Sequence, residues 1–161
     1  TAAQAQRLAD MVRYPPLGKR GSAFSTRAAG YGAFGGAGHT QRSNDGVAFI
    51  AMIETPQAVA AAGEIAAVEG VDAVFIGPND LAHAMGHGSD WNAAPVQRAI
   101  EQGLKAIADA GKCPGIIALS PADEARYGAW GARYFANVST SIITRALAQA
   151  AVGGGGAGLR Y

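Results

Sequence analysis

Four apolar runs of strand length, each followed by a segment of helical character, most constrain how this 161-residue chain can fold. The runs cover residues 47–53, 71–76, 114–119 and 133–138. Continuous apolar runs are typical of parallel strands buried on both faces, and parallel strands need crossover segments between them. The sequence therefore predicts an α/β fold with a parallel sheet.

Between and around these runs, glycine, proline and apolar spacing mark the helices. Helices are predicted over residues 2–12, 56–69, 94–110, 121–130 and 141–151, with a short helical turn ending near residue 85. Residues 14–45 lack a clear period and contain many glycines, so they are predicted to form one long loop. Such a loop is expected to lie on the active face.

Acidic residues at strand ends favour a (β/α) barrel over a Rossmann sheet, and no Gly-x-Gly-x-x-Gly turn follows any run. A complete eight-unit barrel needs about 250 residues. The chain, which starts with Thr1 inside a helical pattern, is therefore expected to be about half of such a barrel, over residues 1–152. The glycine-rich residues 153–161 are expected to be a disordered tail.

Two of the apolar runs lead into a carboxylate, Glu54 and Asp80, one strand-plus-helix unit apart. The carboxyl ends of neighbouring parallel strands lie about 5 Å apart, where two unpaired carboxylates would repel. A hard divalent cation such as Mg²⁺, Mn²⁺ or Co²⁺ would relieve the repulsion and leave positions open for water and a ligand. Alternatively, each acid simply caps the helix that follows it.

A metal at this position could chelate a 2-oxo acid and stabilise an enolate as a Lewis acid. The backbone N–H groups of Asn79 and Asp80 are placed to receive the substrate carboxylate. His83 and His87 could form a second, zinc-type pair, but Gly86 interrupts their helix. His39 is predicted to be a solvated loop residue.

Composition excludes several partner classes. The net charge of +1 provides no footprint for nucleic acid, and no apolar run has the length of a membrane span. A single cysteine, Cys113, fits a reducing compartment, so a cytoplasmic location is expected.

Several stretches together resemble the HpcH/HpaI family of metal-dependent class II pyruvate aldolases, which includes 2,4-dihydroxyhept-2-ene-1,7-dioate and 2-dehydro-3-deoxyglucarate aldolases. The stretches are residues 13–21, 52–55 and 69–81, with 111–116 and 131–135 fitting the next two strands, and the likeness runs from about residue 13 to 149. The resemblance implies a (β/α)8 TIM barrel of which this chain holds the C-terminal four units.

The resemblance also implies roles for individual residues. Glu54 and Asp80 would be the two protein ligands of the metal, and Asn79 and Asp80 would contact pyruvate through their backbone. The adjoining Gly77 and Pro78 would complete the substrate-binding turn.

Two further residues are predicted to lie near the active face. Met52 stands where the heptenedioate aldolases have a substrate-contacting glutamine, and Arg20 could approach from the long loop. The resemblance places the family's catalytic histidine, its supporting acid and its pyruvate-binding arginine in the first half of the barrel.

The expected function is metal-dependent aldol cleavage of a 4-hydroxy-2-oxo acid to pyruvate and an aldehyde. A related expectation is a C–C lyase resembling citrate lyase or malyl-CoA lyase. A different class of function also stays open, that of a half barrel which is inactive until its first half or a partner covers its exposed edge strands. Homo-oligomers are expected.

Overall fold

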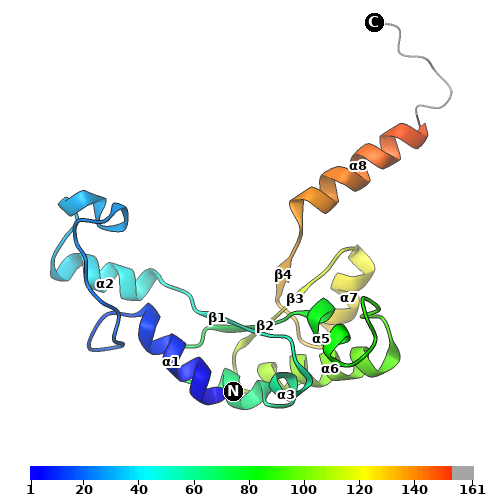
Figure 1. Ribbon diagram of the computed structural model, residues 1–161, viewed down its shortest axis with the longest axis horizontal. Coiled ribbons are helices and arrows are strands. Elements are labelled where there is room, and N and C mark those ends of the chain that lie inside the picture. Colours follow the sequence, from blue (N-terminus) through cyan, green and yellow to red (C-terminus); the bar gives the residue numbers. More distant parts are fainter. Residues whose placement is uncertain (154–161) are drawn as a thin grey trace, which may run out of the picture.

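The computed structural model describes residues 1–153, and its four strands are each followed by helical segments (Figure 1). The elements are α1 (Ala2–Val12), the 3₁₀ helix η1 (Arg27–Gly32), α2 (Ala37–Gly46), β1 (Ile50–Ile53), α3 (Pro56–Ala60), α4 (Ala62–Ala66), β2 (Ala73–Ile76), α5 (Pro78–Ala84), α6 (Ala94–Asp109), β3 (Cys113–Ile117), α7 (Pro121–Ala129), β4 (Tyr134–Ala136) and α8 (Ser139–Gly153). The predicted tail falls outside the described residues except for residue 153, which ends α8.

The four strands form one parallel sheet in the order β1-β2-β3-β4. This confirms the predicted α/β fold, although each strand is shorter than its apolar run. The predicted helix over 56–69 is divided into α3 and α4, because Ala61 leaves the helical region with φ −93° and ψ 15°. The sheet is open, so β1 and β4 are its edge strands.

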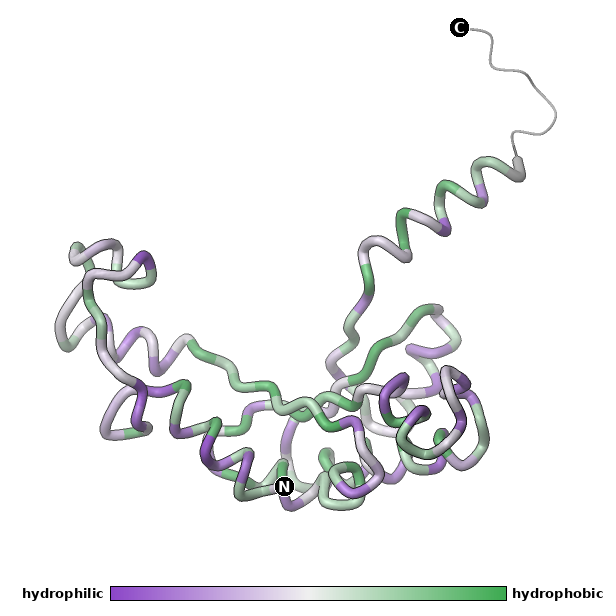
Figure 2. The backbone as a smooth tube through the Cα atoms, in the orientation of Figure 1, coloured by the Kyte–Doolittle hydropathy of each residue, from purple (hydrophilic) through white to green (hydrophobic). Residues whose placement is uncertain are grey.

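Helices cover one face of the sheet and leave the other bare (Figure 1). Val74 and Ile76 of β2 point to the covered face, where they pack with α6 residues such as Leu104 and Ile107 in a fully buried core. Apolar residues run along the central strands in Figure 2. In a closed barrel the bare face would be the interior, so this arrangement is that of part of a barrel.

The bare face carries aromatic and aliphatic side chains. Phe75 and Tyr134 meet edge to face with their ring centroids 5.8 Å apart. A Cβ on Gly115, between them in the register, would lie 2.7 Å from Tyr134 and 2.9 Å from Phe75, so the glycine admits both rings. Beside them Ile50 and Met52 are 41% and 62% exposed.

The prediction of one long loop over residues 14–45 is wrong, because η1 and α2 form within it. His39 of α2 is not solvated but 6% exposed, and its ring meets those of Tyr14 and Phe24 edge to face. Asn44 is buried too, and its side chain accepts a hydrogen bond from Tyr14 N and donates one to Tyr14 O.

This segment lies at the amino ends of the strands. Arg13, which ends α1, donates to Gly70 O at 2.7 Å and pairs with Asp72 at 2.9 Å, and both partners precede β2. The Arg20 guanidinium lies over the Tyr14 ring, 4.7 Å from its centroid. Within the chain, the 14–45 segment and Arg20 are therefore not on the active face that was expected. The reason is topological, since the segment connects a helix to a strand rather than a strand to a helix.

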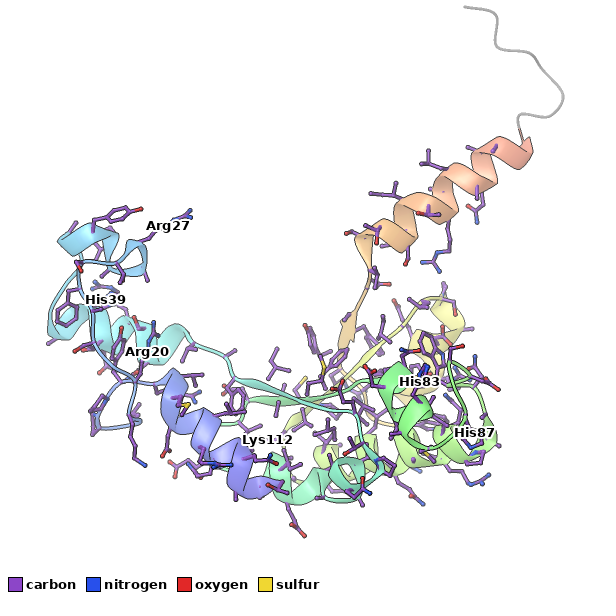
Figure 3. All side chains as sticks on the ribbon, in the orientation of Figure 1. Arg20, Arg27, His39, His83, His87 and Lys112 are labelled. Carbon is purple, nitrogen blue, oxygen red and sulfur yellow. The ribbon has the colours of Figure 1, made fainter. Side chains whose placement is uncertain are left out.

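Figure 3 shows Arg20 and His39 beside α2, far from His83 and His87 near α5. Within residues 1–153, no helix is long and apolar enough to cross a membrane.

Candidate active site at the carboxyl ends of β1 and β2

The carboxyl ends of β1 and β2 are locked to each other by the strand register. Ile53 pairs with Ile76, and the backbone N–H of Gly77 donates to Ile53 O at 2.9 Å. Glu54 is the residue after β1, and Asp80 lies in the first turn of α5, directly after β2. The structure therefore places both predicted carboxylates at one edge of the sheet, on adjoining strand-to-helix connections.

Glu54 lies alongside the turn that begins α5. Its side chain is half-buried, and it occupies the space that a side chain on Gly77 would need. Asp80 is exposed at the third position of α5. Its negative charge is favourable there because the amino end of a helix carries partial positive charge.

Neither acid caps a helix, so the capping alternative is wrong for both. Thr55 caps α3 with its own hydroxyl, which accepts a hydrogen bond from Ala58 N at 3.2 Å. Gly77 is the N-cap of α5 and has no side chain to contribute. A capping bond therefore explains neither carboxylate.

A third acid at a strand end provides the contrast. Asp123 follows β3, where its carboxylate accepts a hydrogen bond from the Ser120 hydroxyl at 2.8 Å and pairs with Arg126 at 2.8 Å. Ser120 in turn caps α7 by accepting from Asp123 N. The carboxylate of Asp123 thus has partners within the fold. Among residues 1–153, by contrast, no hydrogen bond or ion pair engages the carboxylate of Glu54 or Asp80.

The donor set fits a hard divalent cation. It consists of two carboxylates, and no group of three or more His, Cys, Asp or Glu side chains in the described part of the chain could hold a metal. Two protein oxygens suit an ion such as Mg²⁺ or Mn²⁺, which keeps several waters and takes further oxygens from its substrate. A closed structural zinc site needs four protein ligands.

The first turn of α5 presents donors beside these carboxylates. Pro78 occupies the first position of the helix, and the N–H groups of Asn79 and Asp80 follow it, where no intrahelical acceptor is available. His83 Nδ1 lies 3.0 Å from Asn79 O. Because α5 ends at Ala84, His87 lies outside the helix that carries His83, in agreement with the interruption expected at Gly86.

Met52 lies on the bare face of β1, two residues before Glu54 and so on the same side of the strand. A groove of about 440 Å³ runs beside β1, and its lining includes Met52, Glu54 and Thr55 together with residues of α1. The open edge of β1 is thus continuous with the candidate site.

Sequence reasoning found both carboxylates but missed what Gly77 does for one of them. The prediction that Gly77 is part of a substrate-binding turn stays a prediction, and the structure shows in addition that Glu54 occupies the space that a side chain on Gly77 would need. The sequence did hold a signal for this contact. Gly77 comes directly after one buried strand, and Glu54 comes directly after the neighbouring strand.

Comparison with known proteins agrees with this architecture. The family model described as HpcH/HpaI aldolase/citrate lyase matches residues 1–144. A hydroxypyruvate/pyruvate aldolase of Delftia acidovorans is 43% identical over 148 residues, which are 91% of this chain and 54% of that protein. A 5-keto-4-deoxy-D-glucarate aldolase of Shigella dysenteriae serotype 1 is 38% identical over 92% of this chain and 57% of its own length.

A solved structure resembles this fold closely. The crystal structure of an HpcH/HpaI aldolase/citrate lyase family protein from Burkholderia cenocepacia J2315 superposes with a TM-score of 0.87 at 34% identity, over 95% of this chain and 61% of that one. The chain spans about half the length of the curated relatives it matches. On the family-model match and these identities, the chain belongs to the HpcH/HpaI aldolase/citrate lyase family.

Proposed function

We propose that this chain supplies the metal-holding half of a carbon–carbon lyase that cleaves a 4-hydroxy-2-oxo acid to pyruvate and an aldehyde. The observation that carries the proposal is the pair Glu54 and Asp80, which lie at adjoining strand ends and are engaged by no capping bond or ion pair among the described residues. Two of the similar proteins are named as aldolases, which supports aldol cleavage as the reaction class.

Each residue of the site has a part in this proposal. The carboxylates of Glu54 and Asp80 would hold the divalent cation, which when bound supplies a Lewis acid for the oxygen that gains charge as the C3–C4 bond breaks. The N–H groups of Asn79 and Asp80 would donate to the substrate carboxylate. Gly77 and Pro78 would complete the substrate-binding turn.

The half of the reaction that moves protons is not assigned to this chain. Cleavage requires that the C4 hydroxyl lose its proton while the C3–C4 electron pair passes into the enolate of pyruvate. Family resemblance puts the histidine and arginine for these steps in the first half of the barrel. We therefore propose that turnover requires a complete barrel. The first half of that barrel could belong to the whole protein or come from another copy or a partner.

A second candidate function is a lyase of the citrate lyase or malyl-CoA lyase kind, which the family description favours. A third is a partner-dependent half barrel without activity of its own, and the exposed apolar face with Met52 and Ile50 favours it. Pyruvate release from 4-hydroxy-2-oxo acids, with and without Mn²⁺, distinguishes the aldolase from the other two.

Metal binding tests the site independently of turnover. Glu54→Gln and Asp80→Asn are each expected to raise the Kd for Mn²⁺ by about tenfold or more, because a neutral amide replaces an anionic oxygen. Glu64→Gln, which neutralises an exposed acid on α4, is the matched control and should bind Mn²⁺ like the wild type. Unchanged affinity in the first two variants would refute the assignment of the site.

A further inference from the structure

We infer that Gly77 is a positioning residue for Glu54: its missing side chain is the space in which the Glu54 carboxylate is held for the metal. The inference rests on the proposed function and deepens it. It concerns a steric requirement, which differs from the substrate contact expected of the same turn.

The backbone of Gly77 does not require glycine. Its φ of −85° and ψ of 95° lie in the extended range that other residues adopt, and it is absent from the glycines of the described chain with positive φ. A residue before proline is also held in the extended region. An alanine could therefore take the backbone conformation, and the reason for glycine at this position has to be sought in the surrounding atoms.

The three nearest of those atoms belong to Glu54. A Cβ built on Gly77 would lie 2.9 Å from Glu54 Oε2, 3.1 Å from Glu54 Cβ and 3.9 Å from Glu54 Cδ. The contact includes the base of the Glu54 side chain as well as its carboxylate, so rotation about the outer bonds alone cannot relieve the overlap. Alanine at this position would require the base of the Glu54 side chain to shift by a few tenths of an ångström and its carboxylate to move with it.

The backbone cannot move away from the overlap either. Gly77 N is tied to Ile53 O at 2.9 Å, which fixes the turn against the end of the strand that carries Glu54. The same turn leads through the buried Pro78 into Asp80. Gly77 thus sets where one carboxylate stands relative to the other.

The test compares Mn²⁺ binding of the wild-type chain, Gly77→Ala and Gly63→Ala. Gly63 is the matched control because its φ is also not positive and an added Cβ would meet nothing nearer than 3.6 Å. Titration followed by the EPR signal of free Mn²⁺ should give a Kd about 10-fold or more higher for Gly77→Ala, the range seen when a group that orients a ligand is changed. Gly63→Ala should keep the wild-type Kd.

A double variant shows whether Gly77 acts through Glu54. In a Glu54→Ala background the displaced carboxylate is already gone, so adding Gly77→Ala should change the residual Kd by less than about twofold. A further tenfold loss would overturn the inference. If Gly77→Ala does not fold, Glu54→Asp replaces it, because this variant keeps the charge but withdraws it from Gly77 and should also weaken Mn²⁺ binding.

The outcomes separate the two proposals. A wild-type chain that binds no Mn²⁺ overturns the metal site and this inference together. A wild-type chain that binds Mn²⁺, with Gly77→Ala folded and equal to it in affinity, overturns only the role of Gly77. A wild-type Kd for Glu54→Asp would likewise overturn that role.

Discussion

Gly103, in the middle of α6, allows a prediction in which two effects of one substitution oppose each other. Replacing a helical glycine with alanine ordinarily stabilises a helix by about 0.5–1 kcal/mol. At Gly103, however, the new Cβ would lie 2.9 Å from Ile76 Cδ1 and 3.0 Å from Val59 Cγ1, two side chains of the buried core. Overpacking of this kind costs about 1–3 kcal/mol.

The overlap should exceed the helical gain, so Gly103→Ala is expected to destabilise the protein by about 1 kcal/mol and lower Tm by about 2–4 °C. Gly128→Ala in α7 is the control, because its Cβ would meet only Phe135 Cζ at 4.0 Å. That variant should instead gain about 0.5 kcal/mol. Urea unfolding measures both, and stabilisation of both variants alike would refute the close packing of α6 on α3 and β2.

Two further predictions concern the segment that surrounds the end of α1. The hydrogen bond from Lys19 is the main cause that lowers the pKa of Asp10 below 3.8, so Lys19→Met should raise that pKa, as followed by NMR titration of the carboxylate. The pKa of Asp10 is lower in the folded than in the unfolded protein. Its contribution to stability is therefore present above the unfolded pKa and is lost as the pH falls through the folded pKa. An unchanged pKa of Asp10 in Lys19→Met would contradict the assigned cause. Asn44→Ala should cost about 1–3 kcal/mol by leaving the N–H of buried Tyr14 unpaired, and it should speed proteolysis within residues 14–45. Wild-type unfolding and proteolysis of Asn44→Ala would show that this bond does not hold the segment.

The strands and most helices could be predicted because their signals are local. A short continuous apolar run is typical of a buried strand, and proline and glycine mark where the helices begin and end. α6 is the clearest case, since Val96, Ile100, Leu104 and Ile107 follow helical spacing and all four are fully buried. The pairing of Glu54 with the turn before Asp80 follows from the same regularity, because it depends only on the strand order.

α2 could not be predicted because its buried face is polar. His39 and Asn44 occupy the positions where an amphipathic helix would carry aliphatic residues, and Gly36 supplies no side chain to cap it. The helix is held by contacts with Tyr14, about 30 residues earlier in the chain, which no local pattern reveals. The predicted position of Arg20 near the active face was wrong for a related reason. A long segment without a hydrophobic period does not indicate at which end of the strands it lies.

The geometry of the candidate site separates metal binding from turnover. Glu54, Gly77 and Asp80 come from two adjoining strand-to-helix connections, and the hydrogen bond from Gly77 N to Ile53 O joins these connections within the chain. Nothing in that arrangement depends on what covers the bare face of the sheet, where Met52 is 62% exposed. Adding the missing half of a barrel, whether from a longer chain or from a partner, should therefore change pyruvate release far more than the Kd for Mn²⁺. A large gain in Mn²⁺ affinity on completing the barrel would instead show that the first half supplies a ligand of its own.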